Sequence, residues 1–322
     1  MNILITGATG FVGSAVLARL IKEPGVSTAR LRAAVRRPPP APLPGVEYVL
    51  VGDLNEDTDW RNALEGIDAV IHCAARVHVM HDTAANPMEE FRRTNVNGTL
   101  SLAQQAHTAG VKRFIFISSV KVNGEATLPG APFSADDMPT PSDPYGISKL
   151  EAERQLFELG TASTMEVVAI RPVLVYGPGV KANFLSMMRW IDKGVPLPLG
   201  GITRNQRSLV ALPNLVDLIV VCLRHPAAAG QVFLASDGED LSTSALLRRT
   251  ARALNKRPIL LPVPASMLAL GARALGKPGL AQRLCGSLQV DIGKNRALLG
   301  WSPPVSVDTA LKETADAYRC AD

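Results

Sequence analysis

The feature of this sequence that most limits its fold is the alternation of short apolar runs with longer helical patterns in its first half. The runs are apolar on both faces, as expected for strands of a parallel sheet that helices cover on both sides. We therefore expect an α/β fold with a doubly wound parallel sheet, in which ligands bind at the carboxyl ends of the strands. The expected strands are residues 2–6, 31–35, 46–51, 69–72, 114–118 and 167–171.

The pattern becomes less regular after Arg171, where prolines and glycines are frequent. We expect a second, smaller C-terminal region to begin there. Later patterns predict helices over residues 213–223, 242–254, 265–275 and 305–318, and one more strand over residues 231–235. The proline-rich stretch 38–44 suits neither a helix nor a central strand, so we expect an extended surface connection.

A glycine-rich loop directly follows the first expected strand, and a helix over residues 11–21 follows the loop. Glycines in such a turn let main-chain N–H groups and the helix N-terminus approach a pyrophosphate, whose charge the helix dipole favours. The strand–loop–helix context distinguishes this motif from a chance glycine turn. The residues expected to bind dinucleotide phosphates are Gly7, Gly10, Phe11, Val12 and Gly13.

The end of the second expected strand is basic. No Asp or Glu occurs between Arg30 and Pro44, whereas Arg36 and Arg37 stand where an acid would hold a ribose 2′-hydroxyl. Guanidinium groups suit a 2′-phosphate, so we expect NADP(H), with NAD(H) as the alternative. Asp53 follows the third strand and is expected either to accept from the adenine amino group or to serve in a turn.

Tyr145 and Lys149 lie four residues apart in an expected helix, and therefore on one face of it. A phenol titrates near pH ~10, and a neighbouring ammonium lowers that value towards the range of acid–base catalysis. Such a pair is common by chance in helices. It gains weight from Ser118 and Ser119 at the end of the fifth expected strand, which open into the same crevice. A serine there can bind the oxygen that becomes charged in hydride transfer.

The chain resembles the NAD-dependent epimerase/dehydratase family of extended short-chain dehydrogenases/reductases, whose members act on nucleotide sugars. The resemblance is close to full length. It rests on residues 7–13, 53–54, 72–75, 95–99, 118–119, 145–149 and 171–178. It implies a Rossmann-type dinucleotide-binding domain over residues 1–177 with a return segment 210–236, and a nucleotide-sugar-binding domain over residues 178–209 and 237–322.

The resemblance also implies roles for individual residues. Tyr145 is the expected acid/base, Lys149 tunes it and holds the nicotinamide ribose, and Ser119 lies beside the reacting oxygen of the sugar. Further residues expected to line the cofactor are Leu54, Ala74, Ala75, Asn95 and Pro172. Residues expected at the substrate are Lys121, Asn183, Arg207, which suits a diphosphate, and Arg283, which replaces a second family arginine whose usual motif is missing.

Two departures from the family pattern bear on the reaction. Lys121 and Asn123 alter the expected rim of the sugar pocket, and the basic end of strand two suits a net reductase. We therefore favour reduction of a UDP-4-keto-6-deoxy-N-acetylhexosamine in surface polysaccharide synthesis. The alternatives are a UDP-glucose or UDP-N-acetylglucosamine 4-epimerase and a non-catalytic NADP(H)-binding sensor. Dehydration is disfavoured, because residues 119–121 lack the acidic pair of 4,6-dehydratases.

Composition limits the other functions. A formal net charge of +5 and 5% aromatic residues favour a nucleotide-sized anion over nucleic acid. The spacing of the cysteines indicates neither a metal site nor disulfides, so thiols in a reducing cytoplasm are expected. No run reaches the ~18 apolar residues of a transmembrane segment and the start resembles no secretory signal, so we expect a cytoplasmic protein. The family often forms homodimers, but the sequence leaves the oligomeric state open.

Overall fold

Seven parallel strands form the main sheet of the computed structural model, which describes residues 1–23, 30–77, 86–128, 130–274 and 278–321. The strand order places β2 and β3 on one side of the β1–β4 pair and β5, β6 and β9 on the other side. This is the doubly wound Rossmann arrangement that the alternating pattern predicts. In spatial order the strands are β3 (Val46–Leu50), β2 (Leu31–Val35), β1 (Ile3–Thr6), β4 (Ala69–His72), β5 (Arg113–Ile117), β6 (Glu166–Pro172) and β9 (Val232–Ala235).

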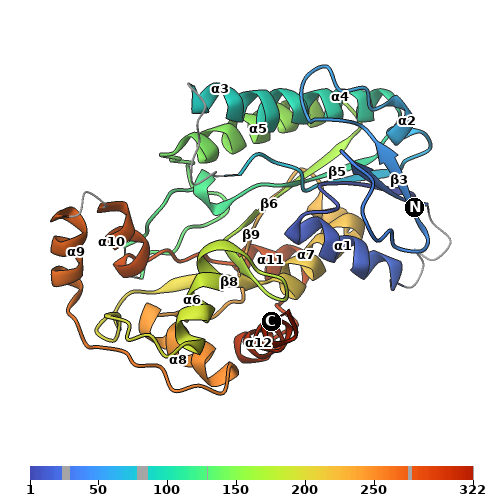
Figure 1. Cartoon of the computed structure of the whole chain (residues 1–322). Coiled ribbons are helices and arrows are strands. Elements are labelled where there is room, and N and C mark those ends of the chain that lie inside the picture. The colour runs from blue at the N-terminus through green and yellow to red at the C-terminus, as the bar shows by residue number, and fades with distance from the viewer. Residues whose placement is uncertain (24–29, 78–85, 129, 275–277, 322) are drawn as a thin grey trace.

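Both faces of this sheet are buried, as the apolar strands require. Ile3 and Ile5 belong to the core on one face, whereas Leu4 between them belongs to the core on the other. The first face is covered by α1 (Phe11–Ile21), α7 (Leu212–Arg224) and α11 (Gly293–Leu299). The second face is covered by α2 (Arg61–Leu64), α3 (Pro87–Phe91), the π-helix η1 (Arg92–Gly98), α4 (Thr99–Thr108) and α5 (Pro144–Thr161) (Figure 1).

A smaller sheet and five α-helices lie outside these layers in the described part of the chain. The sheet joins β7 (Leu174–Tyr176) and β10 (Asp240–Leu241) to the two edges of β8 (Arg207–Ala211). A separate apolar core packs it against α6 (Ala182–Asp192), α8 (Thr243–Ala253) and α12 (Val307–Ala321). At one end of the molecule, α9 (Ala265–Ala274) packs against α10 (Pro278–Cys285) (Figure 1).

The expected elements are found with small shifts of their ends. The strand expected over residues 114–118 covers Arg113–Ile117. The helix expected over residues 265–275 is described as far as Ala274, and Leu275 lies outside the described residues. The sequence did not predict the smaller sheet. The domain boundaries remain a prediction: β7 already belongs to the smaller sheet, while α7 and β9 of the return segment pack on the larger one.

Two buried arginines in the sheet bind the ends of helices that cover it. Arg32 of β2 is 2% exposed, and its guanidinium donates to the main-chain carbonyls of Asn62, Ala63 and Glu65 at the end of α2 (2.8–3.1 Å) and to the Glu47 carboxylate (3.0 Å). On the opposite face, Arg113 donates in the same way to carbonyls at the end of α7. The last carbonyls of a helix lack partners within it, so each arginine fastens a helix to the sheet.

We predict that Arg32→Met lowers the free energy of unfolding by about 3 kcal/mol, because it leaves buried carbonyls without donors. Glu47→Gln is the matched control. It keeps an acceptor for Arg32 at a half-exposed position, so its expected cost is below about 1 kcal/mol. Urea unfolding of both variants measures the difference. Equal losses would show that the carbonyl contacts contribute nothing.

Candidate active site

The glycine loop after β1 packs main chain against main chain. A Cβ atom on Gly7 would lie 2.7 Å from the nitrogen of Ala74, and one on Gly13 would lie 2.2 Å from the carbonyl oxygen of Gly7. Gly7 also has a φ of +64°, a conformation that favours glycine. The turn is closed by a hydrogen bond from the Gly10 nitrogen to the Gly7 carbonyl (2.9 Å). The packing itself therefore requires glycine at two of the three predicted positions, Gly7 and Gly13.

This loop fits the pyrophosphate of a dinucleotide. Gly10 is the N-cap of α1 and supplies no side-chain acceptor, so the first N–H groups of the helix, at Phe11, Val12 and Gly13, have no acceptor from an N-cap side chain. The helix dipole adds positive potential at the same point. The loop lies at the carboxyl ends of β1 and β4, where the strand order reverses and where sheets of this kind bind ligands in a crevice.

The residues expected near the adenosine lie at the adjacent edge. The Arg36 guanidinium lies 3.4 Å from the Asp53 carboxylate, with the two side chains 77% and 78% exposed, and Arg37 is also exposed. Leu54 packs against η1, where a Cβ atom on Gly98 would lie 2.8 Å from its side chain. Because Asp53 offsets the charge of Arg36, this edge carries less positive charge than Arg36 and Arg37 at the end of β2 indicate by themselves.

Asn95 joins three segments around the cofactor crevice. From the middle of η1, its amide accepts from the nitrogen of Arg76 (2.8 Å) and donates to the carbonyl of the same residue (3.0 Å) and to the Ser148 hydroxyl (3.1 Å). This fixes the segment that contains Ala74 and Ala75 relative to α5. Pro172, the last predicted cofactor residue, is buried at the end of β6.

Ser119 lies near Tyr145. Ser119 is the N-cap of the short helix η2 (Val120–Val122), and its hydroxyl is close enough to the Tyr145 phenol to lower the pKa of that phenol. Burial and the nearby Asp143 carboxylate raise the pKa of Tyr145 to about 12, against the opposing effect of Ser119. In this state Tyr145 is a neutral phenol. The expected lowering of its pKa by Lys149 remains a prediction.

Lys149 is a buried cation on the same helix. Its ammonium donates to the Ile117 carbonyl (2.8 Å) and lies 4.3 Å from the centre of the Phe116 ring. Burial lowers the pKa of Lys149 to about 8, while the Glu153 carboxylate opposes this shift. Burial, and then the charge of Lys149, lower the pKa of His72 to about 3, so that histidine is neutral. Lys149 is thus a buried cation close to His72 and Cys73 at the end of β4.

An ion pair fixes η2 to the start of α5. The Lys121 ammonium contacts the carboxylates of Asp143 and Glu125, and Asp143 caps α5 by accepting from the Gly146 nitrogen (2.7 Å). Since the Lys121 main-chain nitrogen donates to Ser119 (3.3 Å), the contacts connect the segments that carry Ser119 and Tyr145. Asp143 was not predicted as a site residue, although an acid directly before a helix-initial proline is a recognisable cap.

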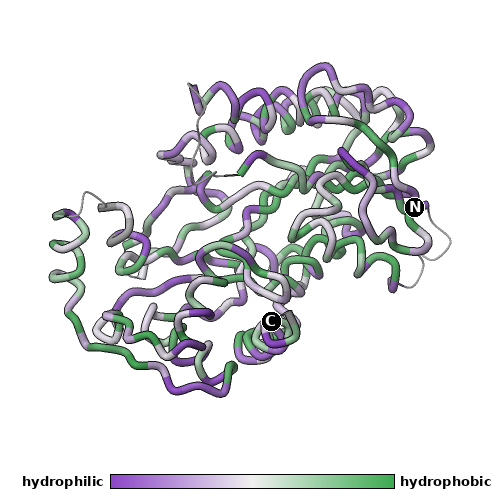
Figure 2. Tube along the Cα trace, in the orientation of Figure 1, coloured by the Kyte–Doolittle hydropathy of each residue, from purple (hydrophilic) through white to green (hydrophobic). Residues whose placement is uncertain are grey.

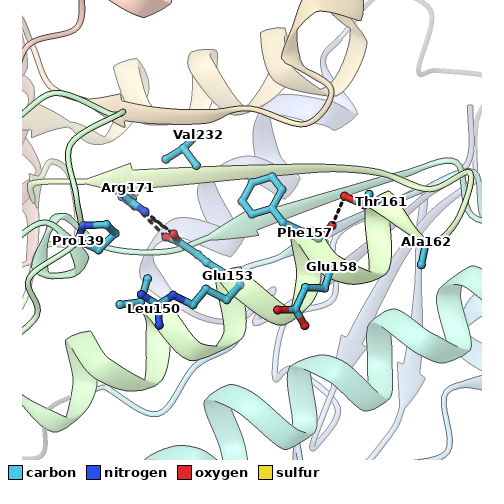
Figure 3. A pocket seen from close by; sticks show the side chains of 10 residues that line it. Pro139, Leu150, Glu153, Phe157, Glu158, Thr161, Ala162, Arg171 and Val232 are labelled. Carbon is cyan, nitrogen blue, oxygen red and sulfur yellow. Dashed lines mark hydrogen bonds and ion pairs between the residues drawn. The ribbon is translucent and has the colours of Figure 1, made fainter.

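A second ion pair lies inside the fold behind the site. Figure 3 shows Arg171 of β6 pointing towards Glu153 of α5 at a cavity of about 620 Å³, and their closest atoms are 2.5 Å apart. Arg171 also donates to the Asn123 side chain (3.0 Å). Asn123 is buried, and its amide also donates to the Ser134 carbonyl, so the expectation that it lines the pocket rim is wrong. Sequence reasoning missed Glu153, although it lies one turn after Lys149.

Three of the predicted substrate residues, Arg207, Arg283 and Asn183, lie on the smaller part of the fold, whereas Ser119 and Lys121 follow β5 of the main sheet. Arg207, at the start of β8, donates to the carbonyls of Arg283 (3.0 Å) and Gly286 (3.2 Å), and burial lowers its pKa. The two predicted arginines are therefore neighbours through this main-chain contact, while the Arg283 side chain is exposed. Asn183 is exposed in the first turn of α6. Their contacts with a substrate remain a prediction.

Two other site classes were searched for within the described part of the chain. There, no group of three or more His, Cys, Asp or Glu side chains could hold a metal ion. Over the same ranges, no helix is long and apolar enough to cross a membrane. The cysteines are unpaired, and burial raises the pKa of Cys73 and of Cys222 to about 12.

Comparison with known proteins identifies the family. The model of the NAD dependent epimerase/dehydratase family matches residues 3–235. UDP-glucose 4-epimerase of Vibrio cholerae is 50% identical over 98% of this chain and 95% of that protein. N-acetyl-alpha-D-glucosaminyl-diphospho-ditrans,octacis-undecaprenol 4-epimerase of Escherichia coli O157:H7 is 29% identical over 83% of this chain and 77% of that protein.

A solved structure shows the same architecture. MoeE5 in complex with UDP-glucuronic acid and NAD superposes with a TM-score of 0.79 at 25% identity, and the match covers 100% of both chains. These matches are to enzymes, which sets aside the non-catalytic sensor that the sequence left open. With the glycine loop, the Ser119–Tyr145 pair and Lys149 in one crevice, the chain belongs to the NAD dependent epimerase/dehydratase family of the short-chain dehydrogenases/reductases.

Proposed function

We propose that this enzyme interconverts the C4 epimers of a UDP-hexose, with UDP-glucose and UDP-galactose as the first pair to test. The observation that carries the proposal is the 50% identity to a UDP-glucose 4-epimerase over nearly the whole of both chains. It favours the epimerase alternative over the net 4-keto reduction that the sequence favoured. A surface polysaccharide as the final destination of the sugar stays a prediction.

NAD is the cofactor that we propose. The expectation of NADP(H) relied on Arg36 and Arg37, but Asp53 adds a negative charge beside Arg36 that disfavours a 2′-phosphate. The similar MoeE5 structure contains NAD. An epimerase also consumes no reducing equivalents, so it has no need of the NADPH pool. The loop of Gly7, Gly10 and Gly13 would hold the pyrophosphate, with Asn95 and Pro172 towards the nicotinamide.

The reaction needs a group that takes a proton from the sugar 4-hydroxyl and later returns it. Tyr145 fits this role, because its half-buried phenol lies near the Ser119 hydroxyl. When bound, the oxidised dinucleotide would supply a reversible hydride acceptor for C4 and a positive charge that favours the Tyr145 phenolate. Ser119 would hold the C4 oxygen, and Lys149 would keep a positive charge at the crevice.

The sugar must present its other face before the hydride returns. The enzyme therefore has to hold the substrate by a part other than the sugar ring. We propose that Arg207 and Arg283 bind the diphosphate and that Asn183 contacts the sugar nucleotide. These residues lie on β8, α10 and α6, apart from the helix that carries Tyr145. Anchoring the diphosphate leaves the hexose free to turn between the two hydride transfers.

We predict that Tyr145→Phe lowers turnover about 10²- to 10⁴-fold, because the phenol is the only proposed proton carrier. Conversion of UDP-glucose to UDP-galactose is followed together with absorbance at the NADH wavelength. The wild-type enzyme should interconvert the sugars without net loss or gain of NADH. Stoichiometric NADPH consumption with a UDP-4-keto-6-deoxy sugar, and no interconversion, would establish reduction instead. Dinucleotide binding by the variant serves as the folding control.

The pH dependence tests the role of Asp143. Its negative charge raises the pKa of Tyr145, so Asp143→Asn should lower that pKa and increase the phenolate fraction at any given pH. The acid limb of kcat/KM is expected to move to lower pH by roughly 0.5–1 pH unit. Asparagine keeps an acceptor for the Gly146 nitrogen, so the cap of α5 is preserved. A limb that stays in place or moves to higher pH would contradict this assignment.

A further inference from the structure

One part of the chain is basic and contains no acid. Residues 241–290 hold eight lysines and arginines but no aspartate or glutamate, although the whole chain has a formal net charge of only +5. The rest of the chain is therefore slightly acidic. Acids outside the segment pair with two of these cations, Arg249 with Glu239 and Asp308 and Lys256 with Asp192, and the remaining positive charge attracts an anionic partner.

The same segment exposes apolar side chains. Residues 259–261 run beside residues 197–200, with hydrogen bonds from Leu261 to Leu197 and from Gly200 to Leu261 (2.8 and 2.9 Å). Leu260 faces the core of the smaller domain, so its neighbours Ile259 and Leu261 face outwards and are 49% and 46% exposed. Figure 2 shows this hydrophobic segment at the edge of the molecule, next to a hydrophilic segment.

Helix α9 presents its large apolar side chains to solvent. Met267 and Leu270 lie three residues apart on one face and are 63% and 70% exposed, while Leu268 packs against the core. No residue of α9 is buried. A surface helix normally turns its large apolar side chains inwards, so the exposure of Met267 and Leu270 is unusual. Neighbouring exposed apolar side chains indicate a surface that something else covers.

Cations surround these side chains. Lys256 and Arg257 precede the exposed apolar stretch, and Arg273 lies in the last turn of α9; all three are exposed. Lys256 is paired with Asp192 (3.1 Å). Apolar side chains flanked by lysine and arginine are the composition of segments that lie in the interface of an anionic bilayer, where the headgroups bind the cations and the acyl region accepts the apolar groups.

We propose that residues 256–274, the basic apolar edge, bind the surface of an anionic lipid bilayer and hold the enzyme there as a peripheral protein. A bilayer fits better than a second copy of the chain, because two such edges would bring like charges together. Attachment is peripheral, since no helix in the described ranges could cross a membrane. The inference concerns a surface outside the crevice and does not rest on the proposed reaction.

The position of the edge suits an enzyme that works close to a membrane. Helix α9 packs against α10, and the end of α10 supplies the carbonyl of Arg283 to Arg207. The bilayer would therefore lie beside the part of the fold where we place the diphosphate of the substrate.

Co-sedimentation with vesicles tests the proposal. Vesicles that contain phosphatidylglycerol should bind the protein at least about tenfold more tightly than pure phosphatidylcholine vesicles, and binding should weaken as salt rises. Met267→Glu combined with Leu270→Glu should lower this binding at least about tenfold, because two carboxylates enter the interface. Arg257→Glu should lower it about fivefold or more. The epimerase assay in solution should not change for any of these variants.

The matched control is Met138→Glu combined with Leu298→Glu, which changes one exposed methionine and one exposed leucine elsewhere on the surface. This control should bind vesicles like the wild type. The proposal is wrong if the wild type binds both kinds of vesicle equally or neither, or if the control loses as much binding as the edge variant. It is also wrong if the edge variant only changes the oligomeric state measured by light scattering, which would make the edge a contact between copies.

Discussion

The close contact between two stretches of main chain at the β1–β4 switch point is the constraint on which the rest of the structure depends. Gly7 lies against Ala74, and Gly13 against Gly7, at distances that admit no Cβ atom. Only this packing lets α1 begin directly at the carboxyl edge of the sheet, with its N-terminus open to a phosphate. The same edge carries Ser119 after β5 and the start of α5, so the phosphate loop and the reacting groups face one crevice.

Four buried basic side chains share one kind of interaction in this fold. Arg32, Arg113, Arg171 and Lys149 are all removed from solvent, and each donates to a main-chain carbonyl or a carboxylate. A buried charge without such partners would be strongly destabilising. Arg32 and Arg113 hold helices on the sheet, whereas Arg171 and Lys149 lie at the site. The enzyme thus uses one kind of interaction both for stability and for the electrostatics of the crevice.

The sequence predicts the main sheet well because most residues of its strands are apolar on both faces. It could not predict β7 and β10, which span three and two residues and are too short to show a period. Tyr145 and Lys149 were predictable from their helical spacing, and Ser119 from its place after a strand. The pairing of Arg36 with Asp53 was not, because it joins residues 17 apart, and the expectation of NADP(H) relied on Arg36 without its partner. The burial of Asn123 likewise depends on Arg171, 48 residues away.

Because η1 is a π-helix, the number of residues in this segment cannot change without altering the site. A π-helix is usually a single widened turn inserted within an α-helix. Loss of one residue from it would restore the narrower turn and rotate the residues on one side by about 100° around the axis. Asn95 could then no longer reach both Ser148 and the chain at Arg76. We therefore expect homologues to differ in length in surface loops such as residues 38–44, whereas selection should remove insertions and deletions in η1.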